Sequence, residues 1–144
     1  MRAMAAGIAL AILTNSAFSI EKMECGGTEP FWDAKLADGR VTFKLGSPRI
    51  YLAPMYSPAS GMHPDFVMSV RAKRGKSNLT AFVVNEAQKV VADKDGAAAA
   101  DPYRAYCSDG MSGRRFPFSI HLIVDGSAYT GCCWTATAPP VGQS

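Results

Sequence analysis

Residues 31–45 read FWDAKLADGRVTFKL, in which two alternating runs of apolar and polar residues flank an Asp-Gly pair. Alternation with a period of two is typical of a β-strand that buries one face. A two-residue Asp-Gly connection favours a type I′ turn, in which both central residues have positive φ. The turn fixes the register and places three pairs on one face: Leu36 with Val41, Ala34 with Phe43, and Trp32 with Leu45. The stretch therefore predicts an antiparallel hairpin with one apolar and one solvated face.

A second hairpin is predicted where residues 116–134 read FPFSIHLIVDGSAYTGCCW around another Asp-Gly pair. The same register gives one face to Phe118, Ile120, Leu122, Tyr129, Gly131 and Cys133. The other face carries Ser119, His121, Ile123, Ala128, Thr130, Cys132 and Trp134. Adjacent residues of a strand point to opposite faces. We therefore expect one cysteine bridge under the core and one on the outer side or rim.

Four further segments have the composition of strands and recur at short spacing with turn residues between them: 49–53, 65–71, 79–84 and 103–107. This pattern predicts an all-β domain, either a small antiparallel β-barrel or a sandwich, with little helix. The Pro/Gly/Ser-rich stretch Pro54–Pro64 is predicted to be one long loop. Weakly capped helices are the expectation over 86–92 or around 96–100.

The chain of 144 residues is long enough for one domain, and its net charge of +3 is too small to indicate a nucleic-acid partner. Arg2, an apolar run over 4–13 and the small residues that follow have the order of a secretory signal peptide. We expect a signal peptide at 1–19, a single β domain at 20–134 and a flexible C-terminal tail at 135–144. The cleaved protein is expected to be periplasmic or secreted, without stable membrane insertion.

The four cysteines form an even set, which in an exported protein indicates disulfides. A bridge between the neighbours Cys132 and Cys133 would strain the peptide unit between them. Two pairings remain, and both tie Cys25 and Cys107 to the last strand. We favour Cys107 with Cys133 and Cys25 with Cys132. The chain has no Cys-x-x-Cys and no histidine at a zinc-like spacing, so a structural role is favoured over redox or metal chemistry.

Residues 25–32 read CGGTEPFW, and residues 107–112 read CSDGMS, followed downstream by Pro-Phe and Gly-Cys-Cys. These stretches resemble the opening and closing motifs of a largely uncharacterised family of small bacterial periplasmic proteins and lipoproteins. The resemblance implies a secreted all-β domain of the kind that sometimes occurs beside META-type and lysozyme-inhibitor-type β-domains. It implies no established activity, and the chain lacks a lipobox, so a lipid anchor is not implied. Besides the cysteines, the motif residues are Glu29, Pro30, Phe31, Trp32, Ser108, Asp109, Gly110, Met111 and Ser112.

These motif residues also have a structural interpretation that needs no family. We expect Trp32 to plug the core and Pro30 to stiffen the entry into its strand. The Asp-Gly pair after Ser108 favours a turn in which Ser108 or Asp109 caps neighbouring backbone amides. Met111 is expected to fill a gap.

No complete catalytic signature is present, so we predict a non-enzymatic protein without a cofactor. It would bind an envelope protein, such as a lysozyme-type hydrolase, or a small ligand in the barrel mouth. A first alternative is periplasmic copper handling, because thioethers and imidazole suit Cu(I); it would use Met55, Met62 and His63. A second alternative is a hydrolase that uses Ser108 or Ser112 with His121. The basic run at 71–76 is predicted to be a solvated hairpin tip, although its charges could also meet an anionic polymer or membrane surface.

Overall fold

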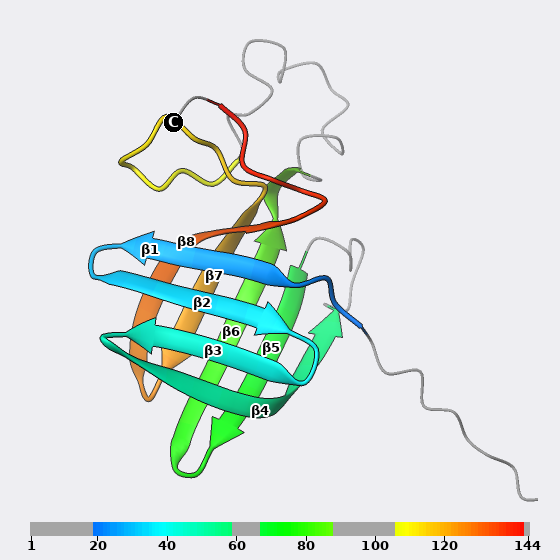
Figure 1. Cartoon of the computed structure of the whole chain (residues 1–144), viewed down its shortest axis with the longest axis vertical. Coiled ribbons are helices and arrows are strands. Elements are labelled where there is room, and N and C mark those ends of the chain that lie inside the picture. Colours follow the sequence, from blue (N-terminus) through cyan, green and yellow to red (C-terminus); the bar gives the residue numbers. More distant parts are fainter. Residues whose placement is uncertain (1–18, 59–66, 88–105, 143–144) are drawn as a thin grey trace, which may run out of the picture.

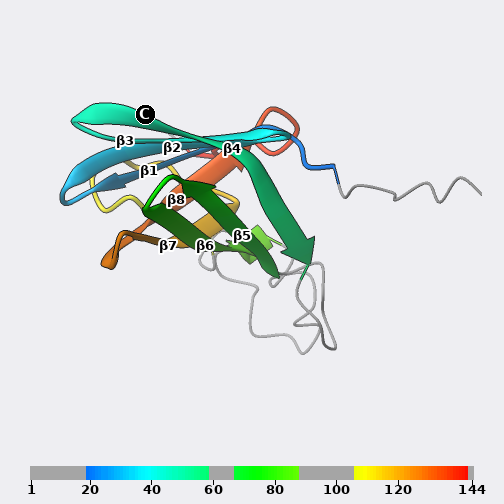
Figure 2. The same ribbon diagram turned by 90° about the horizontal axis from the view of Figure 1, so that it is seen from below.

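Eight antiparallel strands close into a barrel in which each strand pairs with its sequence neighbours and the last returns to the first (Figure 1). The computed structural model describes residues 19–58, 67–87 and 106–142. The strands are β1 (Met23–Thr28), β2 (Phe31–Ala37), β3 (Arg40–Leu45), β4 (Ser47–Pro58), β5 (Val67–Arg74), β6 (Ser77–Asn85), β7 (Phe118–Val124) and β8 (Ser127–Thr135). The all-β prediction is confirmed, and the architecture is the barrel rather than the sandwich. Seen from below, β1–β3 form one side and β5–β7 the other (Figure 2).

Both predicted hairpins form with the predicted register. In β2–β3, Leu36 pairs with Val41 and Ala34 with Phe43. In β7–β8, the pairs include Phe118 with Cys133, Ile120 with Gly131 and Leu122 with Tyr129. The predicted apolar faces point inward, since every second side chain of β2 is buried. Local turn chemistry and binary pattern were therefore sufficient to position these four strands in pairs.

The two Asp-Gly turns differ in backbone conformation. Asp125 and Gly126 have φ values of 51° and 87°, as the type I′ turn of the second hairpin requires. In the first hairpin Gly39 has a φ of 74°, but Asp38 is not in the left-handed region, so the type I′ prediction is wrong there. The Asp38 carboxylate accepts hydrogen bonds from the segment before β1, namely from Ser19 Oγ and the Ile20 N–H.

Two strands depart from the sequence-based assignment. β1 was not predicted, because its Gly-Gly pair has poor strand propensity. β4 continues through Pro58, into the stretch predicted to be a loop from residue 54. Its pairing with β5 shifts between Leu52 and Met55, which is a β-bulge that breaks the alternation used for prediction. Several predicted regions lie outside the described residues. They are residues 59–66 of the predicted loop, the helix predicted around 96–100, and most of the segments 86–92 and 103–107.

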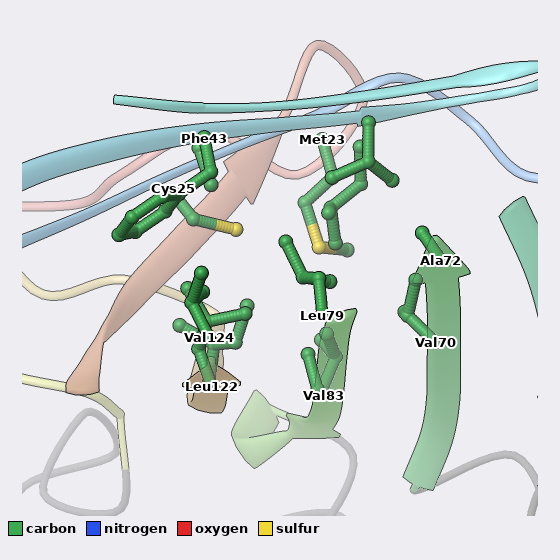
Figure 3. Close-up of a cluster of buried hydrophobic side chains, with 14 of the residues drawn as sticks. Met23, Cys25, Phe43, Val70, Ala72, Leu79, Val83, Leu122 and Val124 are labelled. Atoms are coloured by element: carbon green, nitrogen blue, oxygen red, sulfur yellow. The ribbon is translucent and has the colours of Figure 1, made fainter. Parts of the chain in front are cut away.

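Large apolar side chains fill the barrel interior (Figure 3). The largest fully buried side chains are Tyr51, Phe43, Leu36, Leu79, Ile120 and Leu122. Eight strands enclose a space of about the size that such side chains occupy, so the interior is a packed core. At one end Trp32, which is 3% exposed, packs against Phe43 and Tyr129 with ring centroids 6.0 and 6.2 Å away. The prediction that Trp32 plugs the core agrees with this position.

Two disulfides join distant parts of the chain to β8, and every cysteine takes part in one. They are Cys25–Cys133 and Cys107–Cys132, so the favoured pairing was wrong. The reason is the closure of the barrel: β1 lies beside β8, and Cys25 stands directly opposite Cys133 with both side chains inward. Cys132 points outward, where Cys107 covers it. One bridge thus lies in the core and one on the outer side, as the alternation of β8 predicts.

The segment after β8, predicted to be a flexible tail, pairs with other parts of the chain as far as Val141. The Thr137 N–H and hydroxyl donate to the Glu21 carboxylate, which lowers the pKa of Glu21. Val141 and Arg115 exchange two backbone hydrogen bonds of 2.7 and 2.8 Å. Within the described residues, no helix has the length and apolar character needed to cross a membrane.

Candidate functional site

The two motif segments, which are about 80 residues apart in the sequence, meet at one end of the barrel. The first segment is the β1–β2 connection with the strand ends around it. The second is the segment 107–116, called here the rim loop, which is drawn in yellow beyond β1 in Figure 1. The Thr28 hydroxyl donates to the Asp109 carbonyl over 3.3 Å and joins the two. We take this junction as the candidate site.

The rim loop is held at both of its ends. The Cys107–Cys132 disulfide fastens its start to the outer face of β8. Cys107 and Phe116 exchange two backbone hydrogen bonds of 2.9 Å, which closes the loop at its base. The Phe116 ring then packs against Trp134, with centroids 5.5 Å apart. These contacts fix where the loop sits relative to the barrel.

Asp109 organises the middle of the rim loop. Its carboxylate accepts hydrogen bonds from the Met111 N–H at 3.0 Å, the Ser112 N–H at 2.9 Å and the Ser112 hydroxyl at 2.7 Å. Burial on its own would raise the pKa of Asp109, but the hydrogen bonds from Ser112 and Met111 outweigh it and lower the pKa. The Ser108 hydroxyl accepts from the Gly110 N–H at 3.2 Å. The predicted capping roles of Ser108 and Asp109 are therefore present in the structure.

Glycines allow an unusually close approach of the chain beneath this junction. A Cβ on Gly27 would collide with Trp32 Nε1 and lie 2.6 Å from the Thr130 carbonyl oxygen. A Cβ on Gly131 would collide with the Gly26 carbonyl oxygen and lie 2.8 Å from Trp32 Cζ2. The indole therefore occupies space that a side chain would otherwise fill. It forms the floor of the site.

A groove of about 480 Å³ runs between the barrel wall and the rim loop. We call it the motif groove, and it is lined by Gly26, Gly27, Thr28, Phe31, Trp32, Asp33, Lys44, Gly46, Asp109, Phe116, Cys132 and Trp134. Phe31 is 71% exposed, a high value for a phenylalanine. Asp33 and Lys44 stand opposite each other on β2 and β3 and add one charge of each sign. With Asp109, the groove has three charged side chains beside four aromatic ones.

A smaller hollow of about 250 Å³ shares Thr28 and Asp109 with the motif groove. Ser108, Asp109 and His121 all line it, so the structure brings together residue types that the hydrolase hypothesis needs. However, no hydrogen bond joins His121 to Ser108 or Ser112 in the part of the chain described here. The Ser112 hydroxyl donates to Asp109 instead. Without a serine–histidine hydrogen bond, the geometry does not support an activated nucleophile.

The residues of the copper hypothesis are only partly described. Met55 lies on β4 and is 63% exposed, whereas Met62 and His63 lie outside the described residues. No group of three or more His, Cys, Asp or Glu side chains is placed to hold a metal ion among the described residues. The copper hypothesis stays a prediction.

The remaining motif residues lie on the surface around the groove. Glu29 and Pro30 are exposed in the β1–β2 connection, where the peptide bond between them is cis. Gly110 has a φ of 72°, which suits its turn. Met111 is 69% exposed, so the prediction that it fills a gap was wrong, because the loop turns its side chain away from the core. Sequence reasoning did not assign Asp33, Lys44 or Trp134 to this site. Asp33 follows the motif on β2 but has the pattern of an ordinary exposed strand residue, and Lys44 and Trp134 come from β3 and β8.

Comparisons with known proteins do not assign this chain to a class. No family model matches it, and no curated protein and no solved structure shows significant similarity to it. The functional argument therefore rests on the site.

Proposed function

We propose that this protein is an exported domain of the bacterial cell envelope that acts by binding another envelope protein through the motif groove. The observation that carries the proposal is Phe31, a large aromatic side chain that is 71% exposed at a groove whose far wall is held by a disulfide. Aromatic side chains that enter a partner's pocket dominate the energy of protein interfaces. The chain presents such a side chain at the point where its two motifs meet.

Rigidity supports a binding role for the groove. The rim loop is fixed by Cys107–Cys132, by its backbone pairing with Phe116 and by the Asp109 hydrogen bonds. A surface that is ordered before binding loses less conformational entropy when the partner arrives. The groove is therefore suited to recognise a partner of fixed shape.

The disulfides support the proposal that the protein folds in an oxidising compartment outside the cytoplasm. All four cysteines are paired, and such pairing is typical of proteins that fold in oxidising compartments. Together with the N-terminal pattern of charge, apolar run and small residues, it favours export to the periplasm or beyond.

A small ligand is the second candidate occupant. The volume of about 480 Å³ falls within the range of ligand pockets. Such a ligand would lie in the groove outside the barrel, because Trp32, Phe43 and Tyr129 occupy the end of the interior.

The test compares two substitutions that each remove an exposed phenylalanine. Phe31→Ser alters the groove, and Phe82→Ser alters the outer face of β6, where Phe82 is 48% exposed. The wild-type protein and Phe82→Ser should retain the same dominant protein from a bacterial envelope extract. With that partner purified, Phe31→Ser should weaken binding by about 2 kcal/mol, or roughly 30-fold in Kd.

Equal affinity of Phe31→Ser and Phe82→Ser for the purified partner would refute the groove as the binding surface. Specific retention of a small molecule, with no protein bound by the same groove, would replace the protein partner with the ligand alternative.

A further inference from the structure

A bulge in β4 leaves Met55 on the outer surface of the barrel, which the regular alternation before the bulge already gives to Leu52. Ala53 lies within the bulge at a φ of 49°, a region that residues with a Cβ rarely adopt. Its N–H donates to the Gly39 carbonyl over 3.0 Å, which ties the bulge to the β2–β3 turn. Bulges re-aim the side chains beside them. Here Leu52 is 69% and Met55 63% exposed. Figure 2 shows β4 running with β1–β3 and then bending away from them.

Basic side chains flank both of these apolar residues. Leu52 stands between Arg40 on β3 and Lys73 on β5. Met55 stands opposite Arg71 on β5. Tyr51 and Ala72, which neighbour the apolar and basic residues along β4 and β5, point inward and are buried. The apolar and basic side chains therefore share the outer surface. Directly opposed residues of an antiparallel pair have Cβ atoms about 5 Å apart.

The positive charge of this surface is not neutralised within the described residues. The β5–β6 turn adds two further cations, so the set comprises Arg40, Arg71, Lys73, Arg74 and Lys76, all exposed. None of these five forms an ion pair in the described part of the chain. Of the nearby acids, Asp125 pairs with Arg49, and Asp38 accepts hydrogen bonds from Ser19 and Ile20 and keeps its single negative charge, so the five cations remain in excess. We call these five cations, together with Leu52 and Met55, the basic–apolar face.

We propose that the basic–apolar face docks the barrel onto an anionic lipid surface. Lysine and arginine side chains bind anionic headgroups, and each adds to the affinity while it lies within a Debye length of the surface. Leu52 and Met55 would enter the boundary between headgroups and acyl chains, as apolar side chains of peripheral proteins do. The five cations favour an anionic surface by charge complementarity. The exposed apolar side chains between them favour a surface with an apolar interior, which a lipid bilayer has and an anionic polymer lacks. No residue of the motif groove belongs to this face, so the proposal is independent of the proposed protein partner.

The experiment measures sedimentation with vesicles. The chain from Ile20 contains all eight strands and both disulfides, and it is used throughout. Vesicles are made of phosphatidylcholine alone or of an equimolar mixture with phosphatidylglycerol. We expect the protein to bind the mixed vesicles and to remain in solution with phosphatidylcholine alone.

Two charge variants with the same net charge separate the face from overall attraction. Arg71→Ser with Lys73→Ser should weaken binding about 25-fold, because each cation near an anionic surface contributes about fivefold. Lys22→Ser with Lys35→Ser removes two cations that pair with Glu24 on β1, and it should change binding by less than about twofold. Leu52→Ser with Met55→Ser should abolish the part of the binding that persists at high salt.

The proposal is overturned if the mixed vesicles do not bind the protein, or if the two charge variants weaken binding equally. It is also overturned if Leu52→Ser with Met55→Ser binds like wild type at every salt concentration. Retention on immobilised polyglutamate through the same cations, without vesicle binding, would assign the face to an acidic polypeptide instead.

Discussion

Removal of the Cys25–Cys133 disulfide should destabilise the protein more than removal of Cys107–Cys132. The first bridge spans 108 residues and the second 25. If a disulfide acts by restricting the unfolded chain, these separations correspond to about 5 and about 3.5 kcal/mol. The predicted difference, before rounding, is therefore about 1.3 kcal/mol.

Packing adds to the same difference. Cys25 and Cys133 are 2% and 0% exposed inside the barrel, so replacing both by alanine leaves a space in the core. In the outer pair Cys132 is also buried, at 2% exposed, but Cys107 is only half-buried and lies outside the barrel core. Replacing the inner pair should therefore lower the free energy of unfolding by roughly 1 kcal/mol more than the entropic contribution of about 5 kcal/mol.

Urea unfolding of the two double-alanine variants measures this difference directly. The slope of the free energy against urea concentration should also rise, and more for the inner pair, because an unbridged chain exposes more surface when unfolded. An equal or larger loss for Cys107→Ala with Cys132→Ala would refute the reasoning that the inner bridge dominates.

Three further predictions concern single side chains. Gly131→Ala should destabilise the barrel by about 3 kcal/mol in thermal unfolding, because the new methyl group collides with the backbone of β1; a neutral effect would contradict that close approach. The hydrogen bonds to ionised Asp109 contribute stability that is complete above its ordinary pKa of 3.8 and is lost as the pH falls through its lowered pKa in the folded state. Ser112→Ala should raise the pKa of folded Asp109 in an NMR titration. It should also make the loss of stability on acidification smaller. Burial raises the pKa of Tyr56 to about 12, so its phenol should ionise well above the ordinary value of 10.0 in an alkaline absorbance titration, and folding should weaken as the pH rises past that value. Tyr56→Phe should remove this late step and cost about 1 kcal/mol through the lost hydrogen bond to the Ala37 carbonyl.

The hairpins could be predicted because their information is local. In β2–β3 and β7–β8 a two-residue turn sets the register, and alternation then assigns each side chain to a face. The closing contact of the barrel joins residues about 110 apart in the sequence, and no local pattern specifies it. The cysteine pairing depends on that contact. It was assigned wrongly for this reason, although the inner and outer placement of the two bridges followed from alternation alone.

The candidate site was predictable only in part. The motif segments around Phe31 and Asp109 stood out in the sequence, and the structure places them together. The rest of the motif groove comes from Asp33, Lys44 and Trp134, which alternate along strands like ordinary surface residues. Asp33 and Lys44 face each other through the local register of the β2–β3 hairpin, but their meeting with Trp134 and the rim loop depends on the closure of the barrel and on the outer disulfide. Sequence spacing contains no signal for either.

The central claim is that Cys25–Cys133 closes the barrel while Cys107–Cys132 fixes the rim loop. Peptide mapping without reduction cannot separate neighbouring cysteines, so the decisive measurement uses Cys132→Ser, alkylated at once and digested with trypsin. The account predicts that peptide 23–35 stays linked to peptide 116–144 and that Cys107 in peptide 105–114 is alkylated. A link between peptides 105–114 and 116–144, with Cys25 alkylated, would contradict it.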